Sequence, residues 1–225
     1  MTRQKYTLNL LIFSILALAL SSCQLVPAAT LSPMPTSGTY HQVLTDNFSD
    51  PNSGWTRQRD ANFIADYDNG GYRIHIINKT QSSLWGINNH PINGSVMVEV
   101  DATFIDGSSK NDMGIICRFQ NPENYYYLSI TPKGAFGISK VINGIETLIG
   151  MADMPQIDDV ILGKGLVNHL RVECTDRILV LNVNNVELER IEDTELKSGS
   201  IGLIVGTYSD AAIDVQFDNF SVSEP

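Results

Sequence analysis

The chain has 225 residues, with 15 Lys and Arg residues against 25 Asp and Glu residues and a formal net charge of −10. A surface of this sign repels the phosphate backbone of nucleic acids, and no cluster of Lys or Arg reverses the sign locally. We therefore expect no nucleic-acid partner.

The N-terminal segment has the pattern of a secretory signal peptide. Arg3 and Lys5 give it a basic start, and an apolar run of 13 residues follows at positions 8–20. This run is shorter than the ~20 residues that a helix needs to cross the hydrocarbon core of a bilayer. Residues 1–22 are therefore predicted to direct export and then to be removed, which would leave 13 basic against 25 acidic groups and a net charge of −12.

The predicted cleavage region, Leu20-Ser21-Ser22-Cys23, resembles the bacterial lipobox, in which a cysteine that carries diacylglycerol becomes the first residue. The alternative is an ordinary secretory signal with an incidental cysteine. The resemblance implies lipidation of Cys23 and anchoring to a membrane outside the cytoplasm, because each buried methylene contributes ~0.8 kcal/mol. Some Gram-negative lipoproteins carry Asp after the cysteine, so Gln24 favours the outer membrane if the organism has one.

Residues 23–42 contain the lipidated cysteine and a stretch rich in Pro, Ala, Thr and Ser, without apolar periodicity. This composition is typical of a flexible to semi-extended tether. Residues 43–225 are enough for one domain with a sizeable core.

From residue 43 onward, apolar residues alternate with polar ones, and this period of two indicates β-strands. Turn sequences separate the alternating runs: Asn69-Gly70-Gly71, Asn93-Gly94, Asp106-Gly107, Asn143-Gly144, Thr175-Asp176 and Asn184-Asn185. Asn-Gly and Asp-Gly favour the positive φ of tight hairpins, so neighbouring strands should pair antiparallel. About thirteen strands at short spacing predict an all-β fold, a two-sheet antiparallel β-sandwich or jelly roll, with a closed barrel as the alternative.

Two further cysteines lie in alternating runs of this domain. Cys117 alternates with Ile115, and Cys174 alternates with Val172, so both side chains should point into the core. Because disulfides persist outside the cytoplasm, we expect a bridge between Cys117 and Cys174 that stabilises the fold. The alternative is two buried thiols, which pack as small hydrophobic groups.

Several segments of the domain resemble laminin-G-like jelly rolls of the concanavalin A-like superfamily, which are common in bacterial surface lipoproteins. These segments are residues 46–50 (DNFSD), 53–55 (SGW), 113–119 (MGIICRF), 124–127 (NYYY), 134–138 (GAFGI), 168–172 (NHLRV), 199–203 (GSIGL) and 217–222 (FDNFSV). The resemblance covers nearly the whole domain. It extends to 3-keto-disaccharide hydrolase domains, from which no motif carries over residue by residue. It implies a fold more strongly than a function.

Members of this superfamily bind or cleave carbohydrate, so the outward-facing aromatic residues are candidate sugar contacts. Tyr125 and Tyr127 alternate with the apolar set, and Arg118 is expected on the same face of the preceding strand. Aromatic rings there would stack on a sugar while Arg118 binds hydroxyl groups. The alternative is cross-strand pairing that stabilises the sheet. Trp85 is a similar candidate that could equally be a core residue, and Trp55 is expected in the core.

The resemblance also implies a structural calcium ion. Relatives often hold one between the first and last strands through an aspartate and backbone carbonyl oxygens, ligands that calcium prefers. Asp218 in Phe217-Asp218-Asn219-Phe220 is the candidate side chain, and the alternative is an exposed strand residue. No other cofactor is expected.

A catalytic site is not expected. Glu99-Val100-Asp101 resembles part of the Glu-x-Asp-x-x-Glu or Glu-x-Asp-x-Glu motif of laminarinase-type glucanases, but Thr103 and Phe104 stand where the second glutamate would be. A retaining mechanism needs both carboxylates. The four histidines also lack metal-ligand spacing. We therefore predict a membrane-anchored surface lipoprotein with a non-catalytic module that binds an oligo- or polysaccharide; the alternatives are a glycoside hydrolase and a scaffolding lipoprotein without a sugar ligand.

Overall fold

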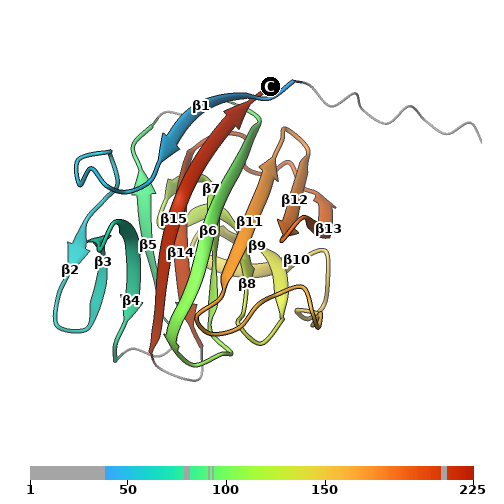
Figure 1. Ribbon diagram of the computed structural model, residues 1–225. Coiled ribbons are helices and arrows are strands. Elements are labelled where there is room, and N and C mark those ends of the chain that lie inside the picture. The colour runs from blue at the N-terminus through green and yellow to red at the C-terminus, as the bar shows by residue number, and fades with distance from the viewer. Residues whose placement is uncertain (1–38, 79–81, 91, 93, 209–211) are drawn as a thin grey trace, which may run out of the picture. The chain divides into compact units, whose positions relative to one another are not determined.

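The computed structural model describes residues 39–78, 82–90, 92, 94–208 and 212–225 (Figure 1), all of which lie in the compact unit Gly38–Pro225. The predicted signal peptide, Cys23 and most of the tether lie outside the described residues. Among the residues described, there is no helix with the length and apolar character needed to cross a membrane.

The described part of the chain folds into two antiparallel β-sheets. Its strands are β1 (His41–Asp46), β2 (Gln58–Arg59), β3 (Phe63–Asp68), β4 (Gly71–Ile76), β5 (Ser82–Asn88), β6 (Val96–Gly107), β7 (Asp112–Asn121), β8 (Asn124–Ile130), β9 (Phe136–Ile142), β10 (Ile145–Ile149), β11 (Val167–Cys174), β12 (Ile178–Val183), β13 (Val186–Glu192), β14 (Ser200–Thr207) and β15 (Ile213–Glu224). One sheet has nine strands in the order β13-β12-β11-β6-β15-β4-β3-β2, with β1 paired to β15. The other has six, in the order β10-β9-β8-β7-β14-β5.

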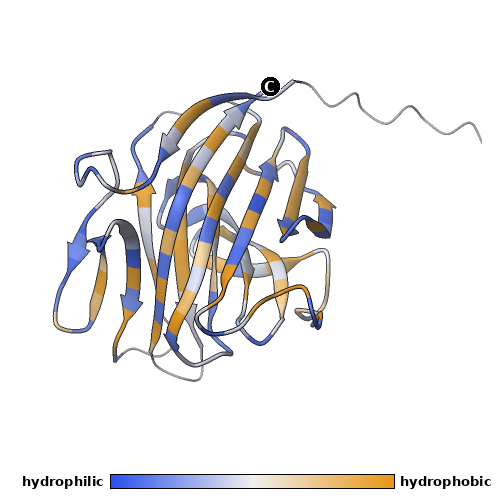
Figure 2. Ribbon diagram, viewed as in Figure 1, coloured by the Kyte–Doolittle hydropathy of each residue, from blue (hydrophilic) through white to orange (hydrophobic). Residues whose placement is uncertain are grey.

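The two sheets pack face to face around one apolar core (Figure 1). In β6, the side chains of Val98, Val100 and Ala102 are fully buried, while the intervening Glu99 and Asp101 are partly exposed. Figure 2 shows this banding along β6, β11 and β15. The period of two in the sequence therefore predicted the two-layered sandwich correctly. The closed barrel was the wrong alternative, because each sheet keeps two open edges.

Tight turns join the antiparallel neighbours as expected. Asn69 and Gly70 between β3 and β4 both have positive φ, at 49° and 77°. Asn143 and Gly144 between β9 and β10 repeat this conformation, at 52° and 76°. Positive φ at both central residues gives the turn the twist of the strands that it connects.

A disulfide links the two layers inside the core. The sulfur atoms of Cys117 in β7 and Cys174 in β11 are bonded at 1.99 Å, and both residues are fully buried. The bridge therefore joins the six-stranded sheet to the nine-stranded sheet. Trp55 is also a core residue, as expected: its ring packs against Phe48 and Phe220, and its indole nitrogen donates a hydrogen bond to the buried Asp46.

Candidate functional site

The outer surface of the six-stranded sheet carries an apolar cluster that is separate from the core. Its buried members are Ile87, Ile116, Tyr125, Tyr127, Val141 and Ile204, and the partly buried side chains of Trp85 and Phe119 pack against them. These residues come from β5, β7, β8, β9 and β14. We call this surface the aromatic face, after its four rings, Trp85, Phe119, Tyr125 and Tyr127.

The four rings of the aromatic face form a continuous group. Ring centroids lie 6.2 Å apart for Trp85 and Phe119, 5.7 Å for Phe119 and Tyr125, and 6.1 Å for Tyr125 and Tyr127. Aromatic pairs attract one another at these separations. Tyr125 and Tyr127 are on the face that the sequence predicted, but each is only 5% exposed. Trp85 and Phe119 pack against the ring of Tyr125, and these two outer rings are partly open to solvent.

The placement expected for Arg118 was wrong, because a β-bulge interrupts the alternation of β7. Arg118 has a φ of 55°, and the pairing of β7 shifts register there with both β8 and β14. Its guanidinium group is 3% exposed and donates to the backbone oxygens of Leu196 and Thr175. An extra residue in one strand turns the following side chains to the other face. Phe119 therefore joins the aromatic face in place of Arg118.

Beside the rings lies a network of hydroxyl and carboxyl groups that sequence reasoning missed. Ser129 and Tyr208 donate hydrogen bonds to the same carboxylate oxygen of Asp112, at 2.9 and 3.0 Å. The Tyr127 hydroxyl donates to Oε1 of Glu146 at 2.5 Å, and it also interacts with the Tyr208 hydroxyl. The network thus connects the aromatic face to β10 and to the end of β14.

Asp112 is the buried carboxyl group of this network. It is 3% exposed, and this burial raises the pKa of its carboxyl group to about 6, against the opposing effect of the hydrogen bonds from Ser129 and Tyr208. Burial likewise raises the pKa of Tyr125 to about 12, and it raises the pKa of Tyr127 and Tyr208 further. The tyrosines are therefore neutral hydroxyl donors, while Asp112 changes charge near pH 6.

Glu99 and Asp101 lie on the other side of the molecule, on the outer surface of the nine-stranded sheet. There Nδ1 of His169 lies 2.8 Å from Asp101, and Nε2 of His169 lies 3.5 Å from Glu99. Asn219 donates a further hydrogen bond to Asp101 at 2.9 Å. The two carboxylates therefore have partners of their own sheet and do not share a surface with the aromatic rings.

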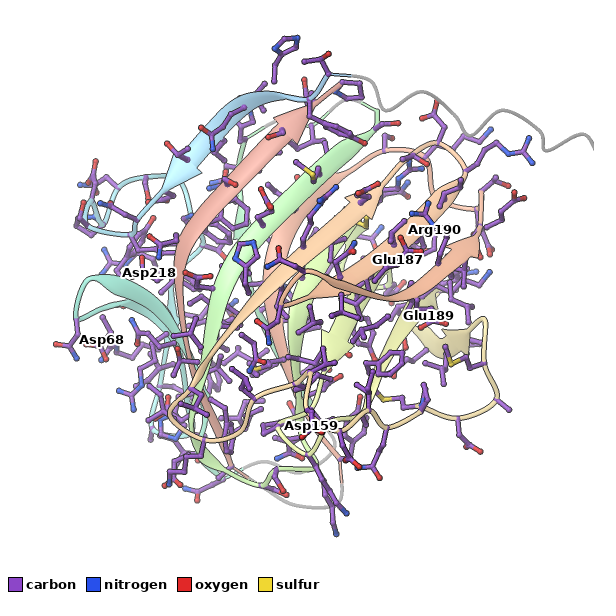
Figure 3. The ribbon with its side chains drawn as sticks, turned by 45° about the vertical axis from the view of Figure 1, so that its right-hand side comes forward. Asp68, Asp159, Glu187, Glu189, Arg190 and Asp218 are labelled. Carbon is purple, nitrogen blue, oxygen red and sulfur yellow. A yellow bond between two sulfur atoms is a disulfide. The ribbon has the colours of Figure 1, made fainter. Side chains whose placement is uncertain are left out.

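Asp218, the candidate calcium ligand, lies on β15 (Figure 3). Its carboxylate accepts a hydrogen bond from the backbone nitrogen of Asn219 at 2.7 Å. The described residues contain no group of three or more His, Cys, Asp or Glu side chains that could hold a metal ion. A calcium ion at Asp218 would therefore need mainly backbone carbonyl ligands, and it stays a prediction.

No protein-family model matches the sequence, and no curated protein does. Several solved structures do match this chain. A carbohydrate-binding module, CBM66, from Bacillus subtilis is 17% identical, with a TM-score of 0.58 over 76% of this chain and 96% of that one. The catalytic domain of an endo-1,3-β-glucanase (laminarinase) from Thermotoga petrophila is 10% identical, with a TM-score of 0.56 over 82% and 98%. A β-glucanase from Bacillus licheniformis is 10% identical, with a TM-score of 0.58 over 84% and 100%. The likeness shows that this chain has the concanavalin A-like jelly-roll fold.

Proposed function

We propose that the protein is a lipid-anchored surface protein whose jelly roll binds carbohydrate on the aromatic face. The observation that carries this proposal is the set of four aromatic rings on the outside of a sheet, apart from the main apolar core. Two of these rings, Trp85 and Phe119, are partly open to solvent. Sugars present C–H groups on one side of the ring and hydroxyl groups at its edge, and aromatic surfaces beside polar groups suit both.

The polar groups next to the rings fit the second part of that chemistry. The carboxylates of Asp112 and Glu146 and the hydroxyl of Tyr208 lie within one hydrogen-bonded network that reaches Tyr127. Carboxylates accept hydrogen bonds from sugar hydroxyl groups, and Glu146 and Tyr208 are exposed members of this network, whereas Asp112 is buried. The name of the CBM66 neighbour adds support, since that protein is a carbohydrate-binding module with the same fold.

The proposal is tested by probing the full chain on a glycan array at high ligand density, together with the variants Trp85→Ala and Phe119→Ala. Each should weaken binding by about tenfold, as expected for the loss of one stacking contact. Ile105→Ala is the matched control, because Ile105 is a partly exposed apolar residue of the nine-stranded sheet. Absence of any glycan signal, or equal binding by all three variants, would remove the proposal and favour a scaffolding role.

The membrane anchor is the second part of the proposal and rests on Leu20-Ser21-Ser22-Cys23. Cells that express the chain should incorporate labelled fatty acid into it, and the Cys23→Ala variant should lose the label and leave the membrane fraction. A mature protein without fatty acid, or with an N-terminus other than Cys23, would contradict lipidation.

Hydrolysis of glycosides is a second candidate function because of one observation. Asp112 lies beside the aromatic face with a pKa raised to about 6, as suits a general acid. Turnover of a glucan and disaccharide panel that disappears in Asp112→Asn would establish an enzyme. The burial of Asp112 beneath Tyr208 and Ser129 favours binding over catalysis, because a proton donor must reach the glycosidic oxygen.

A further inference from the structure

Arg118, next to the disulfide cysteine of β7, has a backbone conformation that needs support from its surroundings. It follows Cys117 directly and has a φ of 55°. A residue other than glycine adopts this left-handed region at a cost in free energy, and it stays there only where neighbouring contacts stabilise it. Two hydrogen bonds, the disulfide and a close backbone approach surround Arg118 in this way.

The guanidinium group of Arg118 is bound to two backbone carbonyl groups outside the six-stranded sheet. Its Nη1 donates to the oxygen of Leu196, between β13 and β14, and its Nη2 donates to the oxygen of Thr175, directly after β11. Among the residues that the structure describes, only Asp176 has a carboxylate within 4.0 Å of this group, and that side chain is 82% exposed. Because water screens so exposed a charge, the carbonyl oxygens set the position of the buried guanidinium group.

The disulfide keeps one of these carbonyl groups in place. Two consecutive residues of β7 are bonded to two consecutive residues at the end of β11, since Cys117 is joined to Cys174 and Arg118 donates to Thr175. The covalent bond fixes the end of β11 beside β7. The oxygen of Thr175 therefore lies within reach of the guanidinium group.

Gly199, just before β14, lies close to the backbone of the bulge in β7. A Cβ atom at this position would lie 2.5 Å from the carbonyl carbon of Arg118 and 2.7 Å from the oxygen of Phe119. Cβ atoms do not adopt such distances unless the neighbouring backbone shifts. The absence of a side chain at Gly199 therefore lets the two strands approach each other at the bulge.

The bulge determines which side chain of β7 reaches the aromatic face. Strict alternation after Ile116, which belongs to that face, would place Arg118 there and Phe119 in the core. The pairing with β14 instead advances by three residues along β7, from Ile116 to Phe119, for two residues along β14. The extra residue turns Phe119 outward, where its ring centroid lies 6.2 Å from that of Trp85.

We infer that Arg118 is a positioning residue of the aromatic face: its guanidinium group stabilises the bulge that places the ring of Phe119 beside Trp85. Arg118 is 3% exposed and acts on the ligand only through Phe119. A guanidinium group suits this role because its nitrogen atoms donate from fixed positions, whereas an ammonium group is one compact donor. The inference rests on the proposed function and adds to it a buried residue on which ligand binding depends.

The test compares the full chain in detergent with the variants Arg118→Met and Arg118→Lys. In isotope-labelled protein, a nuclear Overhauser contact between the ring of Phe119 and the indole of Trp85 reports the position of Phe119 without any ligand. We expect this contact in the parent chain, a weaker contact in Arg118→Lys and none in Arg118→Met. On the glycan array, Arg118→Met should lose about tenfold in binding, as Phe119→Ala does.

The matched control is Arg73→Met. It removes a partly buried arginine from the nine-stranded sheet, where Asp68 and Asp214 bind the guanidinium group. This control separates a general loss of stability from a loss of position. It should keep both the contact between Phe119 and Trp85 and the glycan binding of the parent chain.

Retention of the contact between Phe119 and Trp85 in Arg118→Met, or its loss in Arg73→Met as well, would overturn the inference. Should Arg118→Met not fold, Arg118→Lys decides, and a contact equal to that of the parent chain would overturn the inference. Glycan binding that is unchanged although the contact is lost would contradict the proposed binding surface. Absence of glycan binding by the parent chain would remove the proposed function, while the contact still decides the role of Arg118.

Discussion

The two outer faces of the sandwich have opposite chemistry. On the nine-stranded sheet, Arg73 lies between Asp68 and Asp214, with nitrogen to oxygen distances of 3.0 and 2.7 Å. Farther along the same surface, Glu187 and Arg190 form an exposed pair at 2.6 Å (Figure 3). The outer face of the six-stranded sheet instead carries four packed rings and a buried carboxyl group.

We relate this difference between the faces to the proposed function, which assigns a ligand to only one of them. Exposed ion pairs such as that of Glu187 and Arg190 contribute little to stability, as is usual for the solvent side of a sheet. Aromatic residues on the solvent side of the six-stranded sheet bury area without joining the core, and Trp85 and Phe119 leave part of that apolar area open. The proposed function places the ligand on this partly open apolar area. The predictions below test the contrast between the two faces.

The largest expected effect is on Tyr127, which is 5% exposed within the aromatic face. Tyr127→Ala should lower the free energy of unfolding by about 4 kcal/mol, because removal of a buried ring leaves a cavity. Tyr127→Phe keeps the ring but removes the hydroxyl group with its hydrogen bond to Glu146, and it should cost about 1 kcal/mol. On the nine-stranded face, Val167→Ala should cost less than about 1 kcal/mol, since Val167 is 50% exposed. Urea unfolding measures all three, and equal losses for Tyr127→Ala and Val167→Ala would break the comparison.

The next effect concerns the charge of Asp112. Because burial raises its pKa from 3.8 to about 6, the folded protein favours the protonated form. The stability that Asp112 contributes is complete below pH 3.8 and is lost as the pH rises through 6. Asp112→Asn stays neutral and should therefore be more stable than the parent chain by on the order of 3 kcal/mol at pH 8.

The difference between Asp112→Asn and the parent chain should close near pH 4, where both side chains are neutral. Thermal unfolding between pH 4 and 8 measures it. A difference that is constant with pH would show that Asp112 is not held in a desolvated site.

The smallest effect is expected on the nine-stranded face. Glu187→Gln/Arg190→Gln removes the exposed ion pair and should change the free energy of unfolding by less than about 0.5 kcal/mol. The exposure of both partners, 45% and 48%, explains this small value, because water screens the pair. The loss should be still smaller at high salt. A cost above about 1 kcal/mol would show that this face is not merely a solvated surface.

The sequence predicted the fold through its simplest pattern. Alternation in residues 96–104 and 125–130 placed the core side chains of β6 and β8 correctly, and it placed Tyr125 and Tyr127 on the opposite face. The Asn-Gly turn at Asn143 also predicted its hairpin correctly. Each of these features depends on residues that are neighbours in the chain.

Features that depend on distant residues could not be predicted. Arg118 left the expected face because β7 has a bulge, and nothing in the local sequence gives a positive φ to an arginine. The burial of Tyr125 requires the ring of Trp85, which lies on a different strand. Asp112 receives its hydrogen bond from Tyr208, 96 residues later in the chain. Packing between distant strands determines the position of Arg118, the burial of Tyr125 and the hydrogen bond from Tyr208 to Asp112. A single sequence does not show such packing as a recognisable pattern.

Titration of the full chain with an oligosaccharide tests the central claim most directly, because the two tryptophans report on different places. Trp55 is buried in the core, whereas Trp85 lies on the aromatic face. In a two-dimensional ¹H–¹⁵N spectrum, the indole signal of Trp85 should move as the sugar binds while that of Trp55 stays in place. Sugar binding that leaves the Trp85 signal unmoved would contradict the assignment of the aromatic face as the binding surface.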